Sequence, residues 1–311
     1  MANDGIALID GRWRLGTIGF SYEDWRGAFY PKGLDPKRRL AWYAQRFGAI
    51  ELDTTFYATP AAGTVRGWAD VVPDGFRFAV KAPREVTHEP GPRDAGTLDR
   101  LSAFVDAMRR GLGEKLGVVL LQFPASVTVE RHGAAVMDLL ALLPRGEAGA
   151  RGVSYAVEWR HGSWWTRRMA RFLRDLNGDG LRVAWVGADY PTPDVASLAP
   201  DGPRSVEVCR PPALVHTGEV AYLRWVGNHG QLPASSAEVL DPTARLAWWV
   251  ERLKAYARPD APVREVYGFF GNSYAGHAPA TCRRFAGLMG WPEALAGGSE
   301  AEACLFDEIP A

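Results

Sequence analysis

Short apolar runs alternate with amphipathic stretches along most of the chain. The runs have the length and composition of buried strands, whereas the stretches between them repeat apolar residues at helical spacing. One helix is predicted to begin at Asp35-Pro36, an N-cap residue followed by proline in the first turn, and to end before Gly48. The predicted strands are Leu15–Phe20, the run from Ala49 that contains Glu51, Phe76–Lys81, Leu116–Phe123, Tyr155–Arg160, Leu181–Val186, Val220–Val226 and Val263–Phe270.

Eight strands that alternate with helices predict a parallel sheet, because parallel neighbours need crossover connections. Eight units in roughly 270 residues match a closed TIM-like (β/α)8 barrel. We predict a single α/β domain over 1–311, with the barrel at about 14–290 and a C-terminal extension at 291–311. The segment 190–218 is rich in proline, so the sixth helix is predicted to be short or replaced by a loop. A doubly wound open sheet is the alternative, although no G-x-G-x-x-G follows the first strand.

Glu51 is an acidic residue in an apolar run that is predicted to be a buried strand. Burying an unpaired carboxylate costs several kcal/mol (roughly), so a cationic or metal partner, or a neutral carboxyl group, is expected. Polar residues recur near the C-terminal ends of other strands. Because successive strand residues face opposite sides, the charged residues are predicted to point into the barrel. In barrel enzymes, this end of the barrel carries the active site. The candidate proton carriers are Glu51, Glu158 and His88; the candidate ligand-binding residues are Lys81, Arg160, Arg224, Asn272, Gln122 and Asp189, with Trp25 and Trp164 as possible walls for a ring or sugar.

Composition narrows the class of protein. The 36 basic and 36 acidic residues balance, which gives no electrostatic footprint for duplex nucleic acid or an anionic membrane. Cys209, Cys282 and Cys304 form no C-x-x-C pair, so a disulfide framework and a zinc knuckle are both disfavoured. No apolar run approaches the roughly 18 residues that span a bilayer, and Met1–Arg14 lacks the apolar core of a secretory signal. A cytoplasmic protein without a membrane partner is predicted.

Several of these segments resemble the domain-of-unknown-function 72 family, the YecE-like proteins, over nearly the whole chain. The resemblance implies a TIM-like barrel and no established activity. Two positions depart from the family pattern: Trp225-Val226 stands before Gly227 where Leu-His is common, and Phe270-Gly271 precedes Asn272 where a second Asn is common. The matching segments are Gly19–Trp25 with Phe29-Tyr30-Pro31, Glu51 with Thr54–Tyr57, Lys81, Thr87-His88, Gln122-Phe123-Pro124, Val157–His161 with Ser163-Trp164, Tyr222-Leu223-Arg224 with Gly227, and Asn272 with Ala278-Pro279.

The residues favour an enzyme that acts on a small anionic molecule, either phosphorylated or carboxylated. Arg160, Arg224 and Lys81 would clamp the anion, since guanidinium groups suit bidentate contact with carboxylates and phosphates. Glu51 or Glu158 would act as general acid or base, with a pKa set by burial against those cations. This hypothesis requires no cofactor.

Two alternatives stay open at the level of sequence. A non-catalytic ligand-binding or nucleic-acid-binding protein would use Trp25 and Trp164 to stack a base, although the neutral net charge counts against long nucleic-acid contacts. A hydrolase or nuclease that depends on a divalent metal is disfavoured by the three cations, which already neutralise the acids. Its candidate ligands are Glu51, Glu158, Asp189 and His88.

Overall fold

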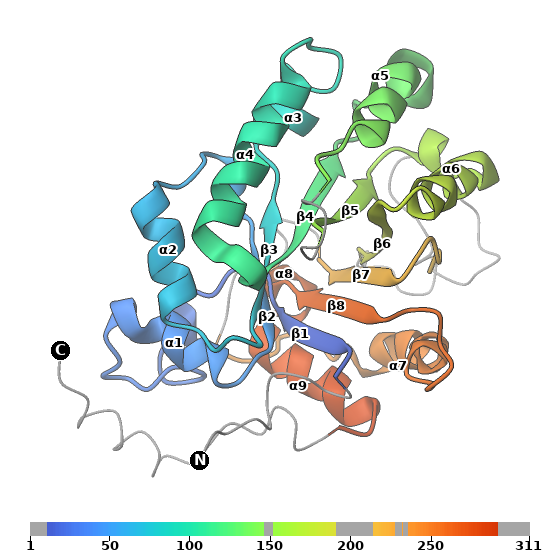
Figure 1. Ribbon diagram of the computed structural model, residues 1–311. Helices are drawn as coiled ribbons and strands as arrows, with labels where there is room; N and C mark the ends of the chain where they lie inside the picture. Colours follow the sequence, from blue (N-terminus) through green and yellow to red (C-terminus); the bar gives the residue numbers. More distant parts are fainter. Residues whose placement is uncertain (1–10, 146–151, 191–213, 228–231, 233–235, 292–311) are drawn as a thin grey trace.

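The computed structural model describes residues 11–145, 152–190, 214–227, 232 and 236–291. Eight parallel strands form one sheet in the order β1-β8-β7-β6-β5-β4-β3-β2, and helices surround it (Figure 1). The sheet curls until its two end strands meet, so the predicted TIM-like α/β barrel is confirmed. The strands are β1 (Trp13–Thr17), β2 (Ala49–Leu52), β3 (Arg77–Lys81), β4 (Leu116–Phe123), β5 (Ser154–Trp159), β6 (Arg182–Asp189), β7 (Val220–Trp225) and β8 (Glu265–Phe270).

Side chains cap the starts of some helices, such as Thr128 before α5 and Thr166 before α6. Asp35 accepts a hydrogen bond from the backbone of Lys37 at 2.8 Å and opens a 3-10 turn that leads into α1. Most of the segment predicted to lack a sixth helix, 191–213, lies outside the described residues. No helix in the described ranges is long and apolar enough to cross a bilayer. The helices are α1 (Arg39–Ala44), α2 (Ala62–Asp70), α3 (Arg84–Thr87), α4 (Thr97–Leu112), α5 (Val129–Ala141), α6 (Arg167–Gly178), α7 (Thr243–Leu253), α8 (Asn272–Ala275) and α9 (Ala278–Leu288); 3-10 turns are η1 (Glu23–Trp25), η2 (Pro36–Arg38), η3 (Thr54–Phe56), η4 (Gly113–Lys115), η5 (Gly162–Trp164) and η7 (Lys254–Tyr256).

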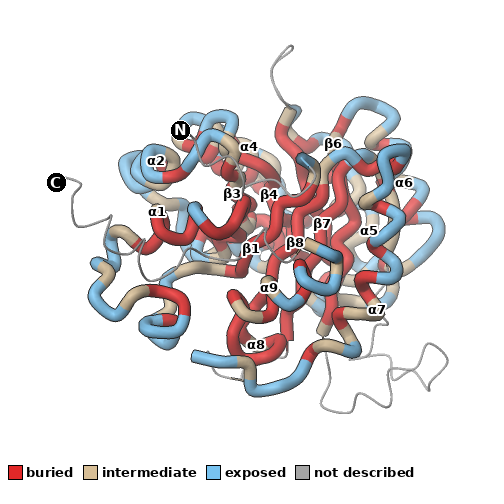
Figure 2. Tube along the Cα trace, turned by 90° about the horizontal axis from the view of Figure 1, so that it is seen from below, coloured by how far each residue is buried: buried red, intermediate tan, exposed pale blue. Residues whose placement is uncertain are grey.

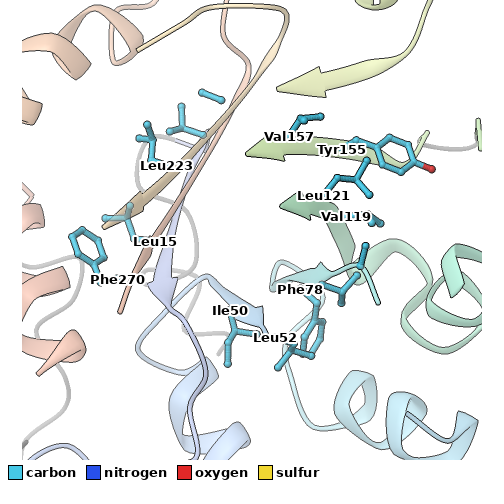
Figure 3. Packing of buried hydrophobic residues seen from close by; sticks show 14 of the residues in the cluster. Leu15, Ile50, Leu52, Phe78, Val119, Leu121, Tyr155, Val157, Leu223 and Phe270 are labelled. Carbon is cyan, nitrogen blue, oxygen red and sulfur yellow. The ribbon is translucent and has the colours of Figure 1, made fainter. Parts of the chain in front are cut away.

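Both faces of the strands are buried, as the red strands in Figure 2 show. Because successive residues point to opposite faces, the strands supply two separate apolar clusters. The outer cluster, part of which appears in Figure 3, packs the strands against the helices. The inner cluster fills the barrel, and it continues toward the C-terminal ends of the strands as a set of charged side chains. Its members include Ile18, Ala49, Ala79, Val118, Leu120, Ala156, Ala184, Val186, Ala188, Val220, Tyr222, Tyr267 and Phe269.

A seam between β1 and β2 closes the barrel. These strands share one isolated bridge, Ile18 with Glu51, instead of a full ladder. Tyr43 of α1 fills the seam: its hydroxyl donates to the carbonyl of Ala49 at 3.0 Å and accepts from the backbone N–H of Thr17 at 2.7 Å. A Cβ on Gly16 would lie 1.9 Å from the Ala49 carbonyl oxygen, so only glycine permits this approach.

Candidate functional site

Four charged side chains of alternating sign lie in contact across the C-terminal end of the barrel. The guanidinium of Arg224 donates twice to Glu51, from Nε to Oε2 at 2.9 Å and from Nη2 to Oε1 at 2.7 Å. Its Nη1 donates to Oε2 of Glu158 at 2.5 Å, and Nε of Arg160 donates to the other oxygen of Glu158. We call this series, Glu51–Arg224–Glu158–Arg160, the ionic chain.

Strand register brings the ionic chain together. Glu51 lies opposite Ala79 of β3, and Arg224 lies opposite Ala188 of β6; both partners belong to the inner cluster, so both charged residues face inward. Arg160 continues β5 by one residue, because its N–H donates to the carbonyl of Phe123 at 3.1 Å. Small inner residues such as alanine leave room for long charged side chains to meet near the barrel axis.

Two tyrosines complete the hydrogen bonding of the buried carboxylates. The hydroxyl of Tyr222 donates to Oε2 of Glu51 at 2.8 Å, and the hydroxyl of Tyr190 donates to Oε1 of Glu158. Burial alone would raise the pKa of Glu158, but Arg160, Arg224 and Tyr190 hold it far below its ordinary value. Glu158 is therefore ionised at neutral pH, and burial together with Glu158 raises the pKa of the Tyr190 hydroxyl.

Lys81 lies beside the ionic chain without a carboxylate of its own. Its side chain is half-buried, and Nζ sits 4.0 Å from the centre of the Phe56 ring. No acceptor among the described residues is within hydrogen-bonding distance of Nζ. Burial, followed by the nearby Arg224, lowers the pKa of Lys81 to about 8 from its ordinary 10.5.

His88 also contacts the Phe56 ring. The two rings are 4.8 Å apart in an edge-to-face arrangement, and Nδ1 of His88 is 2.9 Å from the hydroxyl of Thr87. Burial, Lys81 and nearby arginines lower the pKa of His88 to about 4, so the imidazole is neutral at pH 7. Phe56 thus contacts both an ammonium group and a neutral imidazole.

The low pKa of Lys81 predicts a specific pH dependence of folding stability. Below pH 8 the folded protein must keep this group charged in an unfavourable place, whereas the unfolded chain holds the same proton up to about pH 10.5. Between these values the folded state binds fewer protons, so the contribution of Lys81 to stability improves as pH rises. We expect Lys81→Met to be more stable than wild type at pH 7. The difference in free energy of unfolding between the two proteins should shrink by about 1–2 kcal/mol between pH 7 and pH 10. Urea unfolding at both pH values measures the change.

Lys37 supplies the matched control for this measurement. Its side chain is exposed on the 3-10 turn before α1. Lys37→Met should differ from wild type by the same amount at pH 7 and pH 10. If the stability difference between Lys81→Met and wild type were also the same at both pH values, the surroundings of Lys81 would not disfavour its ammonium form.

Several predicted site residues take supporting positions. Oδ1 of Asn272 accepts from the indole of Trp25 at 3.1 Å and from the backbone N–H of Ala278 at 3.0 Å, which joins the β1 loop to the start of α9. Trp25 is 0% exposed, so it is not available as an open wall of a pocket. Gln122 is buried in β4 in register with Glu158.

Two predicted site residues lie away from the ionic chain. Asp189 ends β6 with the opposite orientation to Ala188, and it pairs with Arg245 of α7 outside the barrel. It also accepts from the indole of Trp249 at 2.7 Å and from the hydroxyl of Tyr274 at 2.9 Å. The Asp189 carboxylate is therefore directed toward α7 and α8.

Trp164 is a core residue, not a pocket wall. It is 0% exposed, stacks on Trp159 with ring centres 4.4 Å apart, and donates from Nε1 to the carbonyl of Val127 at 2.7 Å. The stacking of a base on Trp25 and Trp164 consequently has no exposed surface to use.

Tyr190 and Tyr222 were missed as candidate site residues. Tyr190 follows Ala184, Val186 and Ala188 at the spacing of the inner face, so strand alternation could have identified it. Tyr222 shares the face of Arg224 for the same reason. Both are uncharged at neutral pH, so the pattern of charged residues at the strand ends does not include them.

The donor set does not fit a divalent metal. Among the described residues, no group of three or more His, Cys, Asp or Glu side chains converges. Arg224 lies between the two carboxylates and takes the place that a cation would occupy, and Asp189 faces the outer side. The described residues thus do not supply the ligand set that a metal-dependent hydrolase or nuclease would require.

Comparison with known proteins gives the same family as the resemblance of the sequence motifs. The family described as "Protein of unknown function DUF72" matches residues 14–303. UPF0759 protein YecE of Escherichia coli K12 is 34% identical over 122 residues, 39% of this chain and 41% of YecE. UPF0759 protein YunF of Bacillus subtilis is 27% identical over 158 residues, 49% of this chain and 52% of YunF. The matched region thus spans about half, or less, of the length of each of these relatives.

Solved structures extend the likeness to the whole fold. The crystal structure of a DUF72 family protein from Thermotoga maritima has a TM-score of 0.68 and 26% identity, over 90% of this chain and 99% of that chain. A DUF72 family protein from Enterococcus faecalis, at 19% identity, has a TM-score of 0.63 over 90% of this chain and 98% of its own, a likeness of fold. This chain therefore belongs to the DUF72 family of proteins of unknown function.

Proposed function

We propose that the mouth of the barrel binds a small anionic molecule, carboxylated or phosphorylated, and acts on it by proton transfer. The observation that carries the proposal is the uneven charge of the mouth. Three cationic groups, Lys81, Arg160 and Arg224, face two carboxylates, and the carboxylates already bind the arginines. One positive charge is left in excess among the described residues, and an anion would neutralise it.

The cations divide into two kinds. Arg224 is buried and its three nitrogens all donate to Glu51 and Glu158, so its role in the proposal is to hold the carboxylates. Arg160 uses Nε for Glu158, and its side chain is 27% exposed, with the guanidinium 4.2 Å above the ring of Tyr190. Its remaining N–H groups are the ones that would bind the ligand.

Proton transfer in this proposal falls to Lys81. A group transfers protons best when its pKa is near the working pH, and the pKa of Lys81 is about 8. Glu158 is held ionised by its neighbours, so it would orient Arg160 and Tyr190 and would not exchange protons. The proton carrier in this proposal is thus Lys81 and not Glu158, while His88, with a pKa of about 4, stays neutral at the working pH.

Anion binding can be measured directly by thermal unfolding. At about ten times Kd, a ligand stabilises the folded protein by about 1.4 kcal/mol, which raises the Tm of a chain this size by about 2 °C. We expect phosphate, sulfate or a small carboxylic acid to produce such a rise. Arg160→Gln and Lys81→Gln should each abolish it.

Arg110 on the outer surface of α4 is the matched control. Arg110→Gln removes the same charge from an exposed site and should leave the anion-dependent rise unchanged. An equal rise in all four proteins would place the binding elsewhere, and no rise in wild type with any of these anions would refute the proposal.

A further inference from the structure

Lys81 combines three properties that a structural lysine does not need. It ends β3 on the same face as Ala79, so its side chain enters the barrel. Its Nζ contacts the face of Phe56 at 4.0 Å. Both carboxylates that could have paired with it are bound to arginines, and no described residue accepts a hydrogen bond from it.

These surroundings favour the neutral amine. Burial and the adjacent guanidinium of Arg224 lower the pKa of Lys81 to about 8, so about a tenth of the amine is unprotonated at pH 7. An exposed lysine with the ordinary pKa has less than about a thousandth in that form. Desolvation and a neighbouring cation are the two means by which proteins turn lysine into a nucleophile.

Groups that could assist such a nucleophile surround it. Arg160, with N–H groups left over from Glu158, can hold an anionic group near the amine. Neutral His88 contacts the same Phe56 ring, and the Tyr190 hydroxyl is held against Glu158. An amine, an anion clamp and a neutral imidazole at one barrel mouth suit a carbonyl substrate better than a phosphate ester.

We propose that Lys81 forms a Schiff base with the carbonyl group of a small anionic carbonyl compound, of which 2-oxo acids are the simplest class. The inference rests on the proposed anion site, because Arg160 would hold the carboxylate. The neutral amine attacks the carbonyl carbon to form a C–N bond, and the carbonyl oxygen takes up the proton that nitrogen releases. A second proton, taken up from solvent water, lets that oxygen leave as water, and the C–N bond becomes a protonated C=N bond, without any oxidation or reduction.

Borohydride trapping tests this step on the full-length protein. Borohydride delivers hydride to the C=N bond and converts it to a stable secondary amine, so pyruvate would leave one carboxyethyl group on the lysine. Peptide mapping by mass spectrometry identifies the modified residue. At pH 7.5 we expect Lys81 to be modified at least about tenfold faster than exposed Lys37, because far more of its amine is neutral.

Two variants test whether Lys81 acts as a nucleophile or only as a positive charge. Lys81→Arg keeps the positive charge and cannot form the imine, so anion-dependent thermal stabilisation should persist while trapping at this site is lost. Lys37→Arg should trap as wild type does. Acetone, a ketone without an anionic group, should modify Lys81 at least about tenfold more slowly than pyruvate if Arg160 holds the carboxylate.

The outcomes distinguish the two proposals. Trapping at Lys81 no faster than at Lys37, in a protein that pyruvate still stabilises thermally, would overturn the Schiff base and leave the anion site standing. No thermal stabilisation by any anion together with no selective trapping would overturn both. Rapid trapping at Lys81 with acetone and pyruvate alike would establish the nucleophile and refute its dependence on Arg160.

Discussion

Replacing Arg224 by methionine is expected to destabilise the protein by about 3–5 kcal/mol, the cost of breaking a buried ion pair by removing one partner. Glu51 would lose its charged partner and keep one hydrogen bond from Tyr222, while remaining fully buried. Glu158 would still contact Arg160. Urea unfolding should show a lower midpoint with an unchanged slope.

The double variant Arg224→Met/Glu51→Gln tests the cause of this loss. If the cost comes from an unpaired charge on Glu51, neutralising that residue should recover at least about 1 kcal/mol. Arg110→Met, on an exposed surface, should change stability by no more than about 0.5 kcal/mol. A stable Arg224→Met single variant would contradict the interpretation of Glu51 and Arg224 as a buried ion pair.

Gly227→Ala is expected to cost about 3 kcal/mol or more, because two backbone segments meet at this residue. A Cβ there would lie 1.6 Å from the carbonyl oxygen and 2.0 Å from the carbonyl carbon of Ser273 in α8. Backbone cannot rotate away as a flexible side chain can, so the segment after β7 or α8 itself must shift. Loss of the folded protein, or a large drop in its Tm, is the expected measurement.

Gly67→Ala is the control of opposite sign. Gly67 lies in α2 on an exposed face, and a Cβ there would meet nothing within 4 Å. Alanine should therefore stabilise this helix by about 0.5–1 kcal/mol, since it loses less backbone entropy on folding. If Gly227→Ala were equally well tolerated, the close approach between the β7 exit and α8 would be contradicted.

The barrel could be predicted from the sequence because its signals are local. Apolar runs separated by amphipathic stretches define the units, and the order of units fixes a parallel arrangement. The seam between β1 and β2 could not be predicted in this way. It depends on Tyr43, a side chain of α1 that looks like any other buried aromatic until the two strands are placed beside it.

The site was predicted in part, and strand alternation explains both the successes and the failure. Glu51, Glu158 and Arg224 have inward orientation and meet in the structure. Asp189 was assigned from its place at a strand end alone, although Ala188 already occupies the inward position. Which cation pairs with which acid depends on side-chain lengths across the barrel, and this pairing leaves Lys81 without a carboxylate partner among the described residues.

The pairing of β1 with β8 also bears on how the chain is made. Trp13 to Thr17 form their ladder with Val266 to Phe270, about 250 residues further along, while the neighbour in sequence, β2, contributes a single bridge. During translation the first strand emerges with its backbone donors and acceptors unpaired, and its ladder partner is synthesised about 250 residues later. Until then the nascent chain exposes an open sheet edge, which is a surface for chaperones or for aggregation.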